Sequence, residues 1–535
     1  MQARPRDGRI ERVRARVSIR ERLERFLAGR AAPVALGLIT ALLVAYVWGG
    51  LDAVAAYHDE RAYLVQARLL SHLTWTAPAP PLSIFFEMPH LFVEPRIFAR
   101  YPPGHAPLLV PGIWFGLPGL MPVILAGLTG ALAYIIARRI AGAWIALGTW
   151  GIWTVAPETL DWHSSYFSEA TTSVLWLSVL LALIHWRERE RAWLLAVIVG
   201  GVAWMGITRP VTGIALGIPI AVVVIASGWQ RRSLLGWKRS AVIGALICAI
   251  VPYWSWTTIG SPTRLPYAEY SAWYFPFDMP GFVRDTSPPL RELSPDFEAL
   301  ASATRNAYRG HVPSAMPGNF LTRAYFVARH SLGPVAEPMM ALVPLGMVAL
   351  GGGVALFAGA SFMLLIAAYL VMPHANGWTI YYLEIFPLVP FVAMAGFSWF
   401  AQRVCEHSAS RRWSLFTPRV LFGASFAVPA LLILMTAAGI PARQAHDRMR
   451  SSRQQLARVL ISELPDPRAV VFVRRTSPMS PHFTLWDVLG DPATTPTWIV
   501  RDLGDARNAE LIAVAGDRTP YLLDEVRMTI APYAP

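Results

Sequence analysis

Residues 31–60 have the sequence AAPVALGLITALLVAYVWGGLDAVAAYHDE. Residues 31–51 are almost entirely apolar and are long enough to cross the hydrocarbon core of a bilayer as one helix. His58, Asp59 and Glu60 follow where the helix would leave the membrane, and two adjacent carboxylates are costly there unless they are solvated or used. The stretch therefore predicts a spanning helix that delivers an acidic pair to one face of the membrane.

The whole chain has the composition of a polytopic membrane protein. Of its 535 residues, 54% are hydrophobic and 15% are charged, and the mean hydropathy is +0.41. A soluble domain carries roughly 25% charged residues. The composition therefore excludes the soluble cytosolic enzyme folds.

The basic excess and the cysteines exclude further classes. The formal net charge is +13, and Lys238 is the one lysine among 47 basic residues, a bias typical of a high-GC bacterial genome. Lys238 lies in a basic loop, which argues against Schiff-base chemistry. The two cysteines, Cys248 and Cys405, allow neither a disulfide framework nor a Cys-x-x-Cys metal site.

Eleven apolar runs predict an all-α membrane protein with about eleven spans. The first span is interpreted as an uncleaved anchor rather than a signal peptide, because its apolar stretch is long and its basic leader is extended. The runs lie at 31–51, 119–137, 140–157, 169–186, 193–207, 211–228, 241–258, 334–350, 353–373, 382–401 and 419–438.

The arginines predict the orientation. Residues 1–30 hold ten arginines and four acids, a basic tail typical of a topology signal rather than of a nucleic-acid-binding arm. If this tail is cytoplasmic, the short outer loops at 158–168, 208–210 and 374–381 carry only Arg209. The inner loops carry thirteen cations: Arg138, Arg139, Arg187, Arg189, Arg191, Arg231, Arg232, Lys238, Arg239, Arg403, Arg411, Arg412 and Arg419. We predict a protein of the bacterial inner membrane with a cytoplasmic N-terminus and a periplasmic C-terminus.

Three large segments fall on the outer side. The membrane domain, residues 31–438, contributes the loops 52–118 and 259–333, and residues 439–535 are predicted to form a small soluble α/β domain. Apolar positions at helical spacing predict an amphipathic helix over 442–464. Short apolar runs predict strands at 469–473, 498–500, 510–514 and 528–530.

The acidic pair after the first span has two interpretations. One carboxylate could be a general base that takes a proton from an acceptor hydroxyl or amine. Alternatively, Asp59 caps a helix and Glu60 supports its dipole. Residues 60–73 are predicted to form that helix, with Tyr63 on its apolar face, lying flat on the outer membrane surface.

Two further outer segments carry cations. Arg100 and His105 flank Pro102-Pro103, which is followed by an apolar run too short to span. They suit a phosphate headgroup, or they belong to a turn before an interfacial helix. Arg209 likewise suits a phosphate, or forms a salt bridge with Asp59, Glu60 or Glu169.

The remaining outer acids and aromatic residues are weaker candidates. Glu169 opens the fourth span, and Asp161, His163 and Glu169 could hold a metal ion, although their spacing matches no strong signature. Tyr382 and Glu384 open the tenth span, where the aromatic residues also suit an interfacial belt. The aromatic residues of loop 259–333 suit sugar stacking or burial against lipid.

The order and sidedness of these features resemble the GT-C membrane glycosyltransferases. The closest similarity is to the branch of the protein O-mannosyltransferases and the aminoarabinose transferases of lipid A, over residues 31–210. By position, Asp59 matches the catalytic acid of the family's first loop, Glu60 its second acid, and Glu169 the acid that opens the fourth span. The chain departs from the lipid A branch in having Arg100 for a lysine and Glu169 for an aspartate.

The resemblance implies transfer of a hexose or pentose, with inversion, from a polyprenyl-phosphate donor to a periplasmic glycan, lipid or protein acceptor. Arg100, His105 and Arg209 would bind the donor phosphate and stabilise the charge that develops on it. Asp59, Glu60 and Glu169 would be catalytic. Further candidate substrate contacts are Tyr63, His163, Tyr382 and Glu384. Some family members use a divalent metal ion that neutralises the phosphate, and the sequence leaves this open.

Two other classes compete with the transferase. A transporter or lipid flippase would place polar groups near mid-membrane, and often shows repeats or broken helices. A non-catalytic scaffold would tolerate Asp59→Asn. The ionisable residues cluster at the outer face, which favours surface chemistry over translocation.

Overall fold

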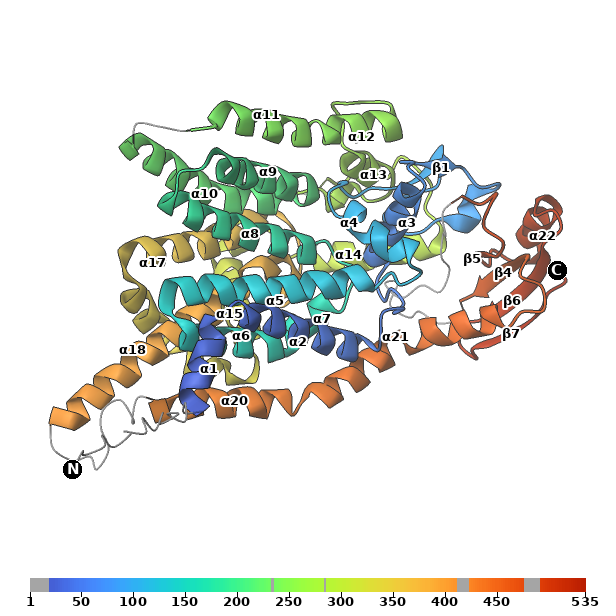
Figure 1. Cartoon of the computed structure of the whole chain (residues 1–535). Helices are drawn as coiled ribbons and strands as arrows, with labels where there is room; N and C mark the ends of the chain where they lie inside the picture. The colour runs from blue at the N-terminus through green and yellow to red at the C-terminus, as the bar shows by residue number, and fades with distance from the viewer. Residues whose placement is uncertain (1–18, 232–234, 283–284, 411–422, 476–490) are drawn as a thin grey trace, which may run out of the picture.

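The computed structural model describes residues 19–231, 235–282, 285–410, 423–475 and 491–535. Long apolar helices lie side by side, and a small sheet domain adjoins one end of them (Figure 1). Residues 1–18 of the predicted tail and the predicted inner-loop residues Arg232, Arg411, Arg412 and Arg419 lie outside the described ranges. The predicted fold class, an α-helical membrane protein with a C-terminal α/β domain, is confirmed.

The apolar helices follow the predicted spans. Eight helical segments of the described chain are long and apolar enough to cross a membrane, and α6 and α9 are shorter apolar helices. The helices of the bundle are α1 (Ile19–Ala28), α2 (Ala31–Trp48), α5 (Leu120–Ala141), α6 (Ala143–Val155), α8 (Glu169–Glu188), α9 (Ala192–Thr208), α10 (Pro210–Arg231), α11 (Trp237–Cys248), α12 (Ile250–Ile259), α17 (Val343–Ala368), α18 (Leu388–Ser410) and α20 (Ala427–Ala437).

A glycine accounts for part of the difference between eight segments and the predicted eleven. Residues 334–350 and 353–373 were expected as separate spans, and two helices that are counted together as α17 do meet between them, at the non-helical residue Gly351 (φ 75°, ψ 167°). This left-handed backbone region suits glycine, which has no Cβ. A Cβ placed on Gly359 would lie 3.3 Å from the Met347 side chain, so the chain turns back at Gly351.

The segments that connect the bundle helices fold into short elements, many of them at one end of the bundle (Figure 1). Their helices are α3 (His58–Ser71), α4 (Ala106–Trp114), α7 (Pro157–His163), α13 (Pro266–Tyr274), α14 (Pro295–Ala307), α15 (Met316–Leu332) and α16 (Ala336–Met340). Their 3-10 helices are η1 (Ser83–Phe86), η2 (Pro276–Asp278), η3 (Pro313–Ala315), η4 (Gly333–Val335), η5 (Tyr369–Val371) and η6 (Thr379–Ile385). Strands β1 (Ala77–Pro78), β2 (Leu91–Phe92) and β3 (Arg96–Ala99) form an antiparallel sheet in the order β1-β3-β2.

Helix α3 corrects one expectation. It was predicted to lie flat on the membrane surface, but ten of its fourteen residues are buried, because α4 and β3 pack against it. Its polar face is therefore enclosed by protein, so that its side chains line an interior rather than an interface with water.

The C-terminal domain begins with α21 (Ile440–Ser462), close to the predicted helix. Its strands β4 (Ala469–Arg474), β5 (Trp498–Arg501), β6 (Thr519–Asp524) and β7 (Thr529–Pro532) form a sheet in the order β5-β4-β6-β7, with β7 antiparallel to β6. The predicted strand at 510–514 is wrong, because these residues end α22 (Asp505–Val514), and β6 was missed. A five-residue apolar run does not distinguish a strand from one face of a helix.

Candidate functional site

The candidate site lies where five segments meet, at the end of the bundle that adjoins the C-terminal domain. These are the first turn of α3, the loop before α4, the N-terminus of α8, the junction of α9 with α10, and η6. Of the ten predicted site residues, Asp59, Tyr63, Glu169, Arg209 and Glu384 belong to one continuous set of contacts. Segments far apart in the sequence thus supply one polar cluster.

Asp59 is the accessible carboxylate of the acidic pair. It is the second residue of α3, and its side chain is 32% exposed, whereas Glu60 is 2% exposed. The Tyr101 hydroxyl donates a hydrogen bond to Asp59 Oδ1. His58 Nε2 lies 3.2 Å from Asp59 Oδ2, and His90 Nε2 lies 3.5 Å from Oδ1. Asp59 is therefore held in place by three side chains while one side remains open.

Two tyrosines connect Asp59 to the start of α8. The rings of Tyr63 and Tyr101 stack at 4.7 Å with an interplanar angle of 22°. The Tyr63 hydroxyl donates to Ser168 Oγ at 3.0 Å, and Ser168 Oγ donates to Glu169 Oε2 at 3.3 Å. Packing and hydrogen bonds thus fix the position of Asp59 relative to Glu169.

Arg209 is the centre of the second half of the cluster. Its guanidinium forms an ion pair with Glu169, and Nη2 donates to the Tyr369 hydroxyl at 2.6 Å. Arg209 Nε lies 3.9 Å from Glu384 Oε1. The salt bridge to Glu169 is one of the two interpretations that the sequence left open. The ion pair with the buried Glu169 thus explains why an arginine occurs in a predicted outer loop, where the positive-inside rule disfavours one.

Glu384 is fully buried at the end of η6 and accepts a hydrogen bond from the Thr172 hydroxyl. Burial raises the pKa of the Glu384 carboxyl to about 7, against the opposing effect of Arg209. Near neutral pH, Glu384 is therefore present in both protonation states, and Glu169 is the other acid available to balance the charge of Arg209.

Arg100, a predicted phosphate contact, already has an acidic partner. Its Nη1 lies 3.1 Å from Asp278 Oδ2, and its guanidinium lies 4.4 Å from the ring centre of Tyr267 and 5.1 Å from that of Tyr270. The side chain is enclosed by aromatic residues of loop 259–333, many of which are buried together. Several of these aromatic residues thus pack in the protein interior.

His105 differs from its predicted role as a cation. The ring is fully buried, with Nδ1 2.8 Å from Thr171 Oγ1 and Nε2 2.9 Å from the Tyr166 carbonyl oxygen. Burial lowers the pKa of His105 to about 4, so the ring is neutral at neutral pH. A neutral imidazole with both nitrogens engaged links α4 to α8 and brings no positive charge to a phosphate.

Glu60, predicted to be catalytic, has both carboxylate oxygens engaged by backbone donors. Oε1 accepts from the Tyr57 N–H at 3.1 Å, and Oε2 accepts from the Tyr166 N–H at 3.0 Å. Burial raises the pKa of Glu60 to about 7, against these two hydrogen bonds. This arrangement is a helix capping box extended to a second loop, and it favours a positioning role.

The suggested metal set in the second outer loop is wrong. Asp161 forms an ion pair with Arg443, and the His163 ring lies edge-on to Trp153 at 5.5 Å. Both ring nitrogens of the buried His163 lack a hydrogen-bond partner within the described chain, whereas Glu169 faces the cluster. The three side chains therefore have separate surroundings.

Tyr382, the last predicted substrate contact, is fully buried behind the cluster. Its hydroxyl lies 3.1 Å from His374 Nε2, and its ring lies 5.6 Å from that of Tyr369. Burial and the nearby Arg323 lower the pKa of His374 well below its usual value. Tyr382 therefore supports Tyr369, which in turn contacts Arg209.

Sequence reasoning missed several members of the site. His58 adjoins Asp59 in the sequence and could have been included, and Tyr101 lies in the motif quoted for its neighbours Arg100 and Pro102. His90 and Tyr369 carry no local signal, because one lies in an irregular loop and the other ends an apolar run. Their roles depend on how the chain folds back.

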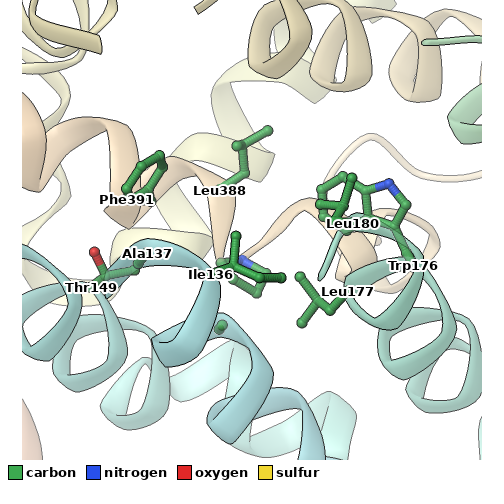
Figure 2. A pocket seen from close by; sticks show the side chains of 10 residues that line it. Ile136, Ala137, Thr149, Trp176, Leu177, Leu180, Leu388 and Phe391 are labelled. Atoms are coloured by element: carbon green, nitrogen blue, oxygen red, sulfur yellow. The ribbon is translucent and has the colours of Figure 1, made fainter. Parts of the chain in front are cut away.

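An apolar pocket lies within the bundle, one helical turn deeper than the Glu384–Thr172 contact. Figure 2 shows side chains of α5, α6, α8 and α18 converging on it, including Ile136, Thr149 and Trp176. Pro387, which lines the pocket, is three residues beyond Glu384, and Trp176 is four beyond Thr172. The cavity volume is about 40 Å³.

No family model and no curated protein matches this chain. Among solved structures, the chain is similar to ArnT from Cupriavidus metallidurans bound to undecaprenyl phosphate, with a TM-score of 0.48 and 15% identity over 85% of each chain. The apo state of the same protein gives a TM-score of 0.48 and 14% identity, over 91% of this chain and 92% of that one.

A second kind of solved protein is also similar. The apo oligosaccharyltransferase of Archaeoglobus fulgidus gives a TM-score of 0.43 and 12% identity, over 93% of this chain and 70% of that one. Similarities of this extent do not show which reaction this chain catalyses.

Proposed function

We propose that this chain is an integral-membrane glycosyltransferase that moves a sugar from a polyprenyl-phosphate donor to an acceptor on the periplasmic face. The observation that supports it most is the placement of Asp59. This open carboxylate, held by three side chains, lies at the outer end of an apolar helix bundle and is joined by tyrosines to a buried arginine.

In this proposal Asp59 is the general base. Its exposed side lets an acceptor hydroxyl or amine approach, and the Tyr101 hydrogen bond fixes the orientation of the carboxylate. A positioned base contributes typically 10²–10⁴-fold to a rate. As Asp59 takes the proton, the acceptor attacks the anomeric carbon, and the bond from that carbon to the donor phosphate oxygen breaks.

Arg209 is the proposed contact for the donor phosphate. Its Nη1 lies 3.3 Å from Ser168 Oγ, which accepts a hydrogen bond from Tyr63, and Arg209 itself lies at the junction of two apolar helices. A phosphate reaching Arg209 would compete with Glu169 for the guanidinium. The apolar pocket beneath Glu384 would then hold part of the polyprenyl chain, because burial of apolar surface is favourable there.

The placement of charge argues against a transporter. The middle turns of α2, α5, α6, α8, α9, α10, α17 and α20 contain no ionisable residue, and the charged residues of these helices lie at their ends. Ionisable groups inside a membrane mark ion and substrate pathways. These helices therefore lack charged groups midway along their length, and their charged residues lie at the ends.

The test is transfer of labelled sugar from a panel of polyprenyl-phosphate sugars by the full-length protein in detergent. Asp59→Asn should lower the rate by about 100-fold or more while polyprenyl phosphate still raises the melting temperature. Asp52→Asn is the matched control, since Asp52 lies in the same loop with a side chain 64% exposed. Transfer that persists in Asp59→Asn would exclude Asp59 as the base.

A further inference from the structure

Three side chains at the mouth of the site have the composition of a metal centre. One ligand atom each from His58, Asp59 and His90 lies within 4.8 Å of the others. Two imidazoles and one carboxylate form a donor set that suits zinc and neighbouring transition metals better than magnesium or calcium, which prefer oxygen ligands.

The distances match a small coordination sphere. With metal–ligand bonds of 2.0–2.1 Å, neighbouring ligands of a tetrahedral zinc ion are about 3.3 Å apart. His58 Nε2 and Asp59 Oδ2 are 3.2 Å apart, and His90 Nε2 and Asp59 Oδ1 are 3.5 Å apart. Each imidazole thus lies at a ligand–ligand distance from a different carboxylate oxygen of Asp59, so an ion shared by both histidines would contact both oxygens.

The histidines are buried and held by neighbours. His58 is 3% exposed and His90 is 7% exposed, and their ring centres are 4.4 Å apart. The backbone N–H of His90 donates to the Tyr270 hydroxyl at 2.9 Å, and the backbone carbonyl of His90 accepts from the backbone N–H of Arg100 at 3.0 Å. These bonds keep His90 at φ 69°, a left-handed conformation that costs energy for a residue with a side chain.

Asp59 accepts a hydrogen bond from a neighbouring side chain, as metal-binding carboxylates commonly do. The Tyr101 hydroxyl donates to Oδ1, and the Tyr101 ring also lies 5.4 Å from that of His90. Hydrogen bonds of this kind orient a ligand and tune the bound metal. One side of Asp59 remains open, so a fourth position could be taken by water or a substrate oxygen.

We propose that His58, Asp59 and His90 form a binding site for a zinc-class divalent transition-metal ion. The alternative is that both imidazoles donate hydrogen bonds to the carboxylate and no ion binds. A bound ion would engage Asp59, so metal binding and proton acceptance by Asp59 would exclude each other. This last consequence rests on the proposed transferase function, whereas the binding site does not.

The test uses tag-free, full-length protein in detergent, stripped with a chelator and titrated with Co²⁺. One Co²⁺ per chain should give visible d–d absorption that Zn²⁺ abolishes. His58→Gln and His90→Gln should each weaken binding at least tenfold, the size expected when a ligand or its direct support is lost. His72→Gln, at the exposed C-terminal end of the same helix, should bind like the wild type.

A second variant keeps the test decisive if the glutamine variants unfold. In His90→Cys the new thiolate should add a near-ultraviolet charge-transfer band on Co²⁺ binding, which the wild type with Cys248 and Cys405 should lack. Failure to saturate at one Co²⁺ per chain, affinity unchanged in both glutamine variants, or a His90→Cys spectrum without the band would each overturn the proposal. None of these measurements depends on sugar transfer.

Discussion

At the scale of single residues, the ion pair of Glu169 and Arg209 should behave as a buried unit. Their side chains are 3% and 11% exposed. Removing one partner of a buried pair leaves an unpaired charge and costs about 3–5 kcal/mol. Arg209→Met should therefore destabilise the protein by about that amount, and Glu169→Gln/Arg209→Met should recover much of the loss. Thermal unfolding of the two single variants and the double variant measures the coupling, and additive losses would contradict it.

The pH dependence of stability gives a second prediction at this scale. The pKa of Glu384 and that of Glu60 are each raised to about 7, above the ordinary value of 4.5, so the folded state binds more protons between these pH values. The free energy of unfolding should therefore fall as pH rises from about 4.5 to about 7, and these two groups should add no further change above that. Glu384→Gln should remove about half of this fall.

The measurement is denaturant or thermal unfolding in detergent from pH 4.5 to pH 8. Glu463→Gln, at an exposed position just after α21, is the control and should keep the wild-type slope. A slope in Glu384→Gln as steep as that of the wild type would show that Glu384 does not titrate in this window.

At the scale of elements, close packing of α17 on α18 gives a third prediction. A Cβ added to Gly346 would collide with the backbone carbonyl of Val392, whereas one added to Gly353 meets nothing within 4 Å. Overpacking costs about 1–3 kcal/mol when backbone must move. Gly346→Ala should therefore lower the melting temperature clearly, and Gly353→Ala, just after the break at Gly351, should leave it nearly unchanged. Equal melting temperatures would contradict this account of the interface.

The elements that could be predicted are those marked by a long apolar run or by a clear break in the chain. Apolar runs located α2, α5, α8 and α10, and a break after Pro102-Pro103 located α4. The wrong strand at 510–514 has a local cause, because a run this short fits either a helix or a strand. The expected division between 334–350 and 353–373 corresponds to the break at Gly351, which no polar loop marks. The surface position expected for α3 failed because its cover comes from distant segments.

The site residues that were predicted carry a local signal in the sequence, whereas those that were missed depend on contacts between distant segments. Charged residues at the ends of apolar runs, such as Asp59, Glu169 and Arg209, are conspicuous because charge is costly there. His90 and Tyr369 enter the site through loop closure and helix packing, which one sequence does not encode locally. Burial also changes roles, since His105 is conspicuous in sequence but neutral and fully hydrogen-bonded in the structure.

At the scale of the whole molecule, the C-terminal domain packs directly on the outer loops rather than standing apart. The ring of Phe86 lies edge-on to Trp498 at 5.4 Å, and one apolar core contains residues from α3, β3 and the domain's sheet. Arg501 at the end of β5 donates to the Glu87 carbonyl oxygen at 3.1 Å and to the Ser294 hydroxyl. The domain thus contacts both outer loops, next to the segment that supplies His90.

Arg501→Met should therefore loosen this junction. The buried Glu87 would keep its ion pair with Arg291 but lose the one with Arg501 at 3.8 Å and the Arg501 hydrogen bond at its carbonyl oxygen. Ser294 would lose a charged donor. Hydrogen–deuterium exchange should become faster in residues 83–94 and 291–297 and stay unchanged in α5 and α8, because opening the junction leaves the bundle intact. Arg527→Met, whose side chain is 82% exposed, is the matched control and should exchange like the wild type. Unchanged exchange at residues 83–94 in Arg501→Met would mean that apolar contacts such as Phe86 with Trp498 hold the domain without this arginine.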